Sequence, residues 1–414
     1  MKALLLERNV ARFAAARVVS AISGSGRAAG VGPLRLVDTD PPDLPGPGWR
    51  HVDVLLAGIC GSDLATLDGR SSRYFEDLVS FPFVPGHEVL GVVADDGSDP
   101  RRVVVEPAIG CVARAISPAC PACAELRTGG CEHVAFGEVS AGLQIGYCAD
   151  TGGGWSAAGL VAHESQLHAV PDEITDFEAV MVEPSACAIH AALAARAGRH
   201  DVVAVLGAGT LGLATVAALR RLSPPGTLVA AARYPHQERL AKQLGADIAV
   251  PDGELTRAVR RRTRSLETSA GLTGGADAVV DCVGSADSVA LALAVVKPKG
   301  RVVLAGMPGT ISVDLAGLWH REVALVGAYA YGVEQSGESA SRRTFDLAFD
   351  LVAAAGLGRL VSATYPLERF EEALAHAGAA GRRGAVKIAF DLRTTRRDRW
   401  RRADQSDREK GKPR

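Results

Sequence analysis

Four cysteines fall within one short segment of this chain, and their spacing suggests metal chemistry. Cys120, Cys123 and Cys131 are spaced C-x2-C-x7-C, and Cys111 lies upstream. The chain begins MKALLLERNV, which lacks the features of a secretory leader, so we expect the cluster to bind metal before it forms disulfides. The three closely spaced thiols look like a four-thiolate zinc site with one ligand missing. The segment is therefore a metal lobe, the remnant of one, or a set of buried thiols.

A glycine-rich loop provides the second chemical signal. The stretch GAGTLG at 207–212 fits G-x-G-x-x-G, follows the apolar run VVAVL and opens the amphipathic stretch LGLATVAALRRL. In that context the glycines allow a tight turn, close approach of a pyrophosphate and close helix packing. Amides at the helix N-terminus then bind the phosphates. We assign the nucleotide site to Gly207, Gly209, Thr210, Leu211 and Gly212, with Gly306 at the end of the run GRVVLAG.

The residues after the second predicted strand of this unit bear on cofactor choice. An acidic residue about 20 positions beyond the loop would hold the ribose 2′-hydroxyl of NAD. Here the run TLVAAAR offers no acid and ends Ala232-Arg233-Tyr234. A small residue followed by arginine leaves room for a 2′-phosphate and supplies a forked cation. Arg233 and Tyr234 therefore favour NADP over NAD; the alternative is a solvated Arg233 and an enzyme that accepts both.

The elements that must position these residues fall into two textures. Up to about residue 176, short apolar runs cut by Gly and Pro predict a β-rich domain. Beyond it, apolar strands alternate with amphipathic helices, which predicts a parallel sheet covered by helices on both faces. The run GAVKIAF near the end has the texture of the first part. We predict a catalytic domain at 1–178 that includes a zinc lobe at 111–133, a cofactor domain at 179–330, a return to the catalytic domain at 331–392 and a disordered basic tail at 393–414.

Three further stretches complete a pattern: GICGSDLATLDG at 58–69, PGHEVLGVV at 85–93 and MVEPSACAIHA at 181–191. Together with the glycine loop, they resemble the zinc-dependent medium-chain alcohol and polyol dehydrogenases over nearly the whole chain up to about residue 390. The resemblance implies an α/β fold with a GroES-like catalytic domain and a Rossmann cofactor domain. It implies a catalytic zinc bound by Cys60, His87 and Glu183, with Glu88 beside the metal and a ligand in some members. This thiolate, imidazole and carboxylate set is one that zinc accepts.

Two more roles follow from the resemblance. Ser62 matches the hydroxyl that relays the substrate proton, and Asp63 matches the carboxylate that orients the histidine ligand. Many relatives have a histidine three residues after the relay hydroxyl, where this chain has Ala65, so the proton must leave by another route. Glu183-Pro184 alone is equally typical of a helix start.

The resemblance also completes the cysteine segment, because relatives carry four thiolates as C-x2-C-x2-C-x7-C. The first position is Ser117 here, a poor zinc ligand. We expect Cys111 to fold back and complete a structural zinc site, since ligand spacing limits reach and not a fixed count. His133 in place of Cys111, or a lobe of only three cysteines, are the alternatives.

The predicted function is hydride transfer between NADP(H) or NAD(H) and a small alcohol, polyol or amino-alcohol, or the matching carbonyl compound. The alternatives are a zinc-free enone or quinone reductase of the same superfamily and a non-catalytic nucleotide-binding protein. A formal net charge of -1 gives no reason to expect a nucleic-acid partner, and the lack of a long apolar run gives none to expect a membrane span. We therefore predict a cytoplasmic protein. The apolar run at 323–330 predicts an edge strand that pairs in a homodimer or homotetramer. The segment at 141–160, with Tyr147 and Trp155, lines the substrate entrance or is a surface loop.

Overall fold

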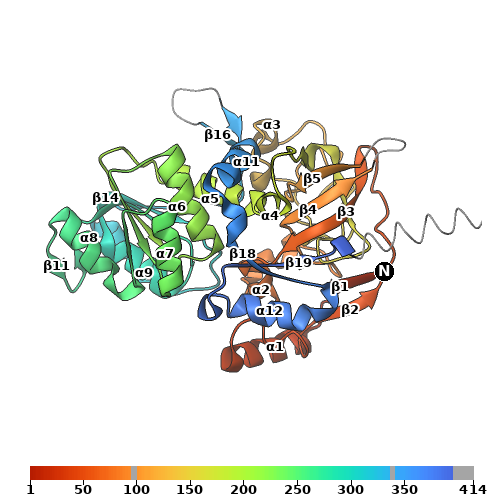
Figure 1. The fold of residues 1–414 in the computed structure, drawn as a ribbon, viewed down its shortest axis with the longest axis horizontal. Helices are drawn as coiled ribbons and strands as arrows, with labels where there is room; N and C mark the ends of the chain where they lie inside the picture. The colour runs from red at the N-terminus through yellow and green to blue at the C-terminus, as the bar shows by residue number, and fades with distance from the viewer. Residues whose placement is uncertain (95–99, 336–340, 395–414) are drawn as a thin grey trace, which may run out of the picture.

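The computed structural model describes residues 1–94, 100–335 and 341–394, and it has two large sheets side by side (Figure 1). No helix in these ranges is long and apolar enough to cross a membrane. The predicted basic tail at 393–414 lies outside the described residues from position 395 onward. The fold class predicted from the sequence, a GroES-like domain and a Rossmann-type sheet, is confirmed.

The six-stranded sheet is parallel throughout and has the order β10-β9-β8-β13-β14-β15. In this order the chain runs outward from a central strand to one edge and then to the other, which is the doubly wound arrangement of dinucleotide-binding folds. The strands are β8 (Val202–Leu206), β9 (Thr227–Ala231), β10 (Ile248–Val250), β13 (Ala276–Asp281), β14 (Val296–Leu304) and β15 (Ala324–Gly327).

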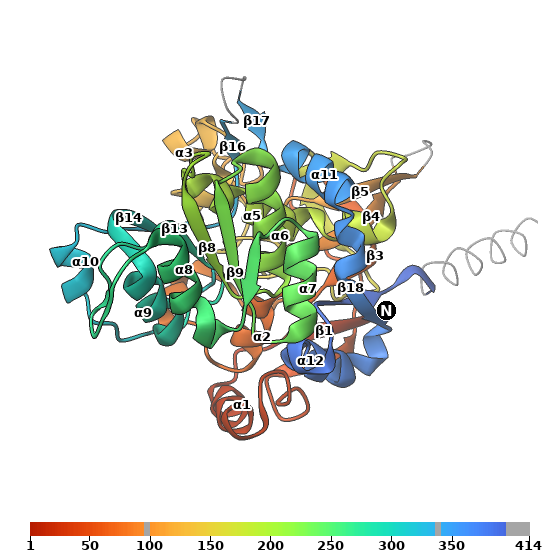
Figure 2. The ribbon, with the colours of Figure 1, turned by 60° about the vertical axis from the view of Figure 1, so that its left-hand side comes forward.

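Helices cover both faces of this sheet (Figure 2). Strands β8 and β9 are apolar along almost their whole length, as expected where both faces of a sheet are buried, so these two runs do not alternate in polarity. The helices are α5 (Val182–Ala194), α6 (Thr210–Leu222), α7 (Pro235–Gln243), α8 (Leu255–Thr263), α9 (Ala286–Val295) and α10 (Ala316–His320), and a small ribbon pairs β11 (Glu267–Thr268) with β12 (Gly271–Leu272).

The second sheet is seven-stranded, with the order β18-β19-β3-β4-β5-β7 and with β6 also paired to β3. Its central strands are antiparallel, and only β18 and β19 run parallel to each other. The strands are β3 (Trp49–Gly58), β4 (Val89–Val93), β5 (Arg101–Val105), β6 (Leu160–His163), β7 (Leu167–Ala169), β18 (Val361–Tyr365) and β19 (Lys387–Asp391). The last described strand thus returns to this seven-stranded sheet, where β19 lies between β18 and β3.

The remaining elements surround the two sheets, and α11 packs against α5 between them (Figure 1). They are β1 (Lys2–Leu6), α1 (Val10–Ser23), β2 (Leu34–Asp38), α2 (Gly61–Leu67), α3 (Pro121–Ala124), α4 (Asp176–Ala179), β16 (Val333–Glu334), β17 (Arg342–Arg343), α11 (Thr344–Ala355) and α12 (Phe370–Gly378). Of these, β1 pairs with β2, and β16 pairs with β17.

Helix α1 was not predicted from the sequence. Asn9 caps it by accepting a hydrogen bond from the Arg12 amide at 3.1 Å, and alanine-rich residues then favour the helix. The turn after α1 is fixed by Asp68, a carboxylate that is fully buried. Asp68 accepts hydrogen bonds from the Ser20 and Ser25 hydroxyls, and it also contacts the Arg70 guanidinium. Because Asp68 directly follows α2, it joins α1 to the helix that begins at the predicted catalytic residues.

Candidate active site and cofactor site

Cys60, His87 and Glu88 come together where β3 ends and β4 begins. Cys60 is the N-cap of α2, two residues beyond β3, and His87 and Glu88 directly precede β4. The two strands are antiparallel neighbours, and the Gly58 amide donates to the Glu88 carbonyl at 2.8 Å. Their potential ligand atoms all lie within 4.8 Å of one another. A thiolate, an imidazole and a carboxylate at this separation fit a zinc ion.

Asp63 organises this group from the first turn of α2. Its Oδ2 accepts a hydrogen bond from the Cys60 amide at 2.9 Å, and its Oδ1 lies 3.3 Å from Nδ1 of the buried His87. The two atoms are at ion-pair distance, and among the described residues His87 Nδ1 makes no hydrogen bond that meets geometric criteria. Burial favours the neutral imidazole, but the charges of Asp63 and Cys60 outweigh it and hold the pKa of His87 well above its usual value. The surroundings of His87 therefore favour positive charge.

Lys387 forms a buried ion pair with Glu88, and sequence reasoning missed it. It is the first residue of β19, which pairs with β3, and its Nζ also donates to the Ile59 carbonyl at 3.2 Å. A Cβ atom at Gly58 would lie 1.9 Å from Glu88 Oε2, so this position needs glycine to accommodate the pair. Burial disfavours the ammonium ion, yet Glu88 keeps the pKa of Lys387 above its usual value. The contact could not be predicted from local sequence, because the two residues are 299 positions apart.

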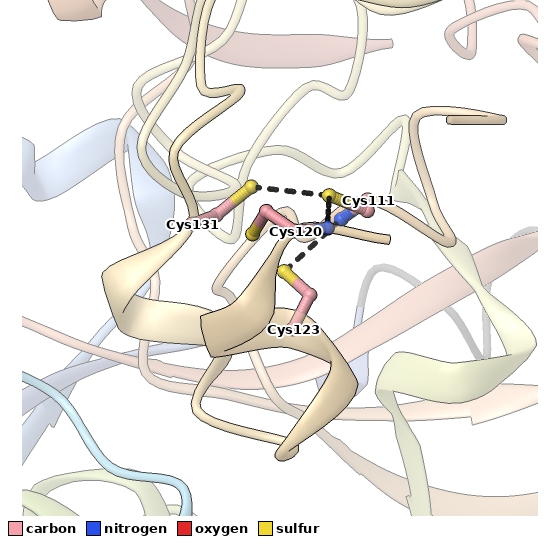
Figure 3. A group of neighbouring side chains, drawn as sticks. All are labelled: Cys111, Cys120, Cys123 and Cys131. Carbon is pink, nitrogen blue, oxygen red and sulfur yellow. Dashed lines mark hydrogen bonds between the residues drawn. The ribbon is translucent and has the colours of Figure 1, made fainter. Parts of the chain in front are cut away.

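The four cysteines of the lobe form a second group (Figure 3). Cys111 and Cys131 Sγ atoms lie 3.7 Å apart, close to the roughly 3.8 Å expected between two thiolates on one tetrahedral zinc ion. All four sulfur atoms lie within 4.8 Å of one another, and all four residues are buried. Cys111 therefore folds back to complete the set. His133 is not needed as a ligand, because four sulfur atoms already form the group; its Nδ1 lies 3.3 Å from the Cys111 sulfur.

A cavity of about 310 Å³ opens at the glycine loop, at the carboxyl ends of β8 and β9. Gly207 and Gly209 line it, with Arg233 and Tyr234 from the turn after β9. The turn needs glycine at 207, where φ is +85°, and a Cβ at Gly212 would lie 1.7 Å from the Gly207 carbonyl oxygen. In the part of the chain that the structure describes, no atom lies within 4 Å of a Cβ placed on Gly209, so the loop is open to a ligand there. The cavity has the form of a dinucleotide phosphate site.

Residues 377–382, at the end of α12 and just beyond it, also line this cavity. Of the other residues assigned to the cofactor, Thr210 and Leu211 begin α6, and Gly306 lies two residues beyond β14. A Cβ at Gly306 would lie 2.5 Å from the Val283 backbone, so glycine lets the ends of β13 and β14 approach each other.

Two family models match the chain. One, described as an alcohol dehydrogenase GroES-like domain, matches residues 46–172, and one described as a zinc-binding dehydrogenase matches residues 210–354. A sorbitol dehydrogenase of Arabidopsis thaliana is 30% identical over 294 residues, which cover 69% of this chain and 75% of the relative. The chain belongs to the zinc-binding dehydrogenase superfamily.

Other members of the superfamily align over more of the chain. An L-idonate 5-dehydrogenase of Vitis vinifera is 27% identical over 357 residues, 84% of this chain and 89% of the relative. A zinc-binding dehydrogenase of Sinorhizobium meliloti 1021, solved with NADP, is 25% identical, has a TM-score of 0.64 and covers 86% of this chain and 95% of its own. Galactitol-1-phosphate dehydrogenase of Escherichia coli, 19% identical with a TM-score of 0.68, shares the fold over 94% of this chain and 100% of its own.

Glu183 lies in the first turn of α5 and is buried, but it is not part of the close group formed by Cys60, His87 and Glu88. Burial raises the pKa of Glu183 to about 7, and the charge of Glu88 adds to the rise. The Cys187 thiol, one turn further along α5, donates to Glu183 Oε1 at 3.6 Å. In this superfamily member the geometry thus brings Glu88 closest to Cys60 and His87, while Glu183 stays a predicted ligand.

Ser62 lies half-buried at the start of α2, and its carbonyl accepts a hydrogen bond from the Thr66 hydroxyl at 2.9 Å. Its proposed relay role stays a prediction. Trp155, in the segment at 141–160, is fully buried and donates from Nε1 to the Gly58 carbonyl at 3.2 Å, so it supports the core. Tyr147 of the same segment reaches Asp63, a contact that the sequence did not indicate.

Proposed function

We propose that this protein is an NAD(P)-dependent zinc dehydrogenase that interconverts a small polyol or related alcohol and its carbonyl form. The observation that carries the proposal is the presence of both halves of the machinery in one chain. Cys60, His87 and Glu88 form a zinc-type ligand group at the end of β3, and the glycine loop at 207–212 opens a dinucleotide cavity. The polyol class is supported by the sorbitol and L-idonate dehydrogenases among the relatives and by the Glu183-Pro184 pair.

Bound zinc would supply a Lewis acid for the substrate oxygen, and the nicotinamide would accept or return a hydride. Cys60 and His87 would hold the metal, with Glu88 or Glu183 as the carboxylate. Asp63 keeps His87 in place from the first turn of α2. Ser62, half-buried at the start of the same helix, would take the alcohol proton. The chain contributes alignment of the two reactants, which is a large part of the barrier reduction in such reactions.

We further propose NADP as the preferred cofactor. Arg233 lines the cavity and is exposed, as a 2′-phosphate ligand must be. Asp252 Oδ2 lies 3.9 Å from Arg233 Nε and opposes this preference, because a carboxylate there repels a phosphate and can accept a hydrogen bond from a ribose hydroxyl. The Arg233→Ala variant tests whether Arg233 sets a preference for NADP: kcat/KM for NADP should fall at least about tenfold, with little change in kcat/KM for NAD. An equal loss for both cofactors would contradict the preference.

We also propose a homodimer that pairs β15 with its symmetry mate. This strand is at the edge of the six-stranded sheet, and three apolar residues near it are exposed: Leu325 at 39%, Leu315 at 53% and Trp319 at 81%. A Leu325→Lys substitution should yield monomers in sedimentation velocity, and an unchanged dimer would contradict this pairing. A cytoplasmic location is proposed on chemical grounds, since the four lobe cysteines must stay reduced to bind zinc.

The central experiment is a panel of polyols, sugars, amino-alcohols and ketones assayed with both cofactors, alongside metal analysis of the wild type and Cys60→Ala. We expect oxidation of a polyol by the wild type, and loss of that activity and of one zinc per chain in Cys60→Ala. Retained activity in Cys60→Ala would reject the catalytic zinc. Enone reduction by metal-free protein would favour a zinc-free reductase, and tight NADP binding without any turnover would favour a non-catalytic role.

A further inference from the structure

We propose that Tyr147 is a positioning residue of the catalytic site, which holds Asp63 against His87 from outside the metal group. Tyr147 OH donates a hydrogen bond to Asp63 Oδ1 at 3.3 Å. That oxygen is the same atom that lies 3.3 Å from His87 Nδ1. The Tyr147 ring also packs against His87, with ring centroids 5.9 Å apart. One side chain therefore contacts both the metal-site histidine and the carboxylate that orients it.

The backbone around Tyr147 is built against the backbone around His87. Gly146 has φ +87°, and a Cβ there would lie 2.9 Å from the Gly86 carbonyl oxygen, so the two chains touch directly. The Gly154 amide donates to that same Gly86 carbonyl at 2.8 Å, and the Trp155 amide donates to Pro85 at 3.0 Å. The segment that carries Tyr147 thus wraps around the residues just before His87. The segment at 141–160 therefore supports the candidate metal site and is not a surface loop.

The Tyr147 hydroxyl is itself fixed from α2. Thr66 Oγ1 lies 3.4 Å from Tyr147 OH and 3.0 Å from Ser71 Oγ, and it donates to the Ser62 carbonyl at 2.9 Å. Thr66 is one helical turn beyond Ser62, so the Tyr147 hydroxyl contacts the same short helix that carries Asp63, and its single proton is free for Asp63 because Thr66 donates its own to Ser62. On the other side, the Tyr147 ring packs against Phe83 at 5.3 Å. The phenol therefore has a defined position and not a free rotation.

The physical consequence concerns the orientation of Asp63. Its Oδ2 is held by the Cys60 amide, and without Tyr147 the described residues offer Oδ1 only the His87 nitrogen at ion-pair distance. Partners of this kind, which orient a ligand without touching the metal, typically contribute about 10–100-fold to metal affinity or activity. We expect the Tyr147 hydroxyl, acting through one carboxylate, to contribute about tenfold.

The test compares Tyr147→Phe, which keeps the ring and removes only the hydroxyl, with Tyr74→Phe, a control at a side chain 74% exposed. Zinc affinity is measured by chelator competition, and the zinc missing from Cys60→Ala identifies the catalytic ion. Tyr147→Phe should bind that ion about tenfold more weakly, with a lower kcat and little change in KM, while Tyr74→Phe matches the wild type. Wild-type zinc affinity and kcat in Tyr147→Phe would overturn the proposal.

A double-variant cycle separates positioning from general loosening. If Tyr147 acts through Asp63, adding Tyr147→Phe to Asp63→Asn should weaken zinc binding little beyond Asp63→Asn alone; fully additive losses would overturn the proposal. If Tyr147→Phe does not fold, Tyr147→Met, which also lacks a donor and fills much of the volume, provides the same two readouts and the same criteria. The kinetic arm rests on the proposed function. The metal-affinity arm does not, so failure to turn over any alcohol would reject the dehydrogenase and leave the role of Tyr147 measurable.

Discussion

The buried ion pair between Lys387 and Glu88 gives a prediction whose size follows from its burial. Their side chains are 1% and 2% exposed, so Lys387→Met would leave a carboxylate without its cation in the core. Breaking a buried pair from one side costs about 3–5 kcal/mol, which is two to three and a half powers of ten in the folding equilibrium. We expect a loss of this size in the metal-free protein. With zinc bound the loss should be smaller, because Glu88 lies within 4.8 Å of Cys60 and His87 and can be neutralised by the metal.

The assay is denaturant unfolding of metal-free and zinc-loaded protein, followed by tryptophan fluorescence. Lys299→Met is the matched control, because Lys299 pairs with Glu322 at the surface with 76% of its side chain exposed, and its loss should cost less than about 1 kcal/mol. Adding Glu88→Gln to Lys387→Met should recover much of the metal-free stability, since no unpaired charge then remains. The reasoning is refuted if metal-free Lys387→Met is no less stable than the Lys299→Met control.

Three further predictions concern the lobe, helix α1 and a second buried acid. Cys123→Ser should remove the lobe zinc and lower the melting temperature while the zinc held at Cys60 remains, as read from metal content. Asp68→Ala should lower the free energy of unfolding by roughly 2–4 kcal/mol, because it leaves buried hydroxyl and amide donors without an acceptor. It should also expose the α1 segment to proteolysis; unchanged proteolysis would argue that Asp68 does not hold α1 in place. Burial acts to raise the pKa of Glu106, but His168 and Arg343 hold it below its usual value, so its stabilisation is present above the unfolded pKa near 4.5 and is lost as pH falls through the folded pKa. Glu106→Gln should therefore be less stable than wild type at pH 7, and the difference should shrink as pH falls through the folded pKa of Glu106; a difference that stays constant from neutral to acid pH would contradict the assignment.

Contacts within short sequence windows could be predicted, because their physics is local. The glycine loop needs its turn and close approach within six residues, and the cysteine lobe needs only a short excursion of the chain to bring Cys111 to Cys131. The gathering of Cys60 with His87 and Glu88 was reached by resemblance, and the pairing of β3 with β4 explains it physically.

Long-range contacts could not be predicted in this way. Lys387 sits in an unremarkable strand sequence, and nothing local marks it as the partner of Glu88. Tyr147 reaches Asp63 across 84 positions for the same reason. Helix α1 is different, because its local signals, an Asn9 cap and alanine-rich residues, are present in the sequence and were obscured by the strand-like texture around them.

The position of β19 also sets when the metal site can be completed during synthesis. This strand lies inside the catalytic sheet, between β18 and β3, and it brings Lys387 to Glu88. Every strand of the cofactor sheet lies between residues 202 and 327, so that sheet can form while the ribosome is still adding residues. The seven-stranded sheet cannot be completed until β19, the last described strand, has been synthesised, because β19 pairs with an edge of β3. The predicted zinc ligands Cys60 and His87 are thus made long before Lys387, the cation that neutralises Glu88.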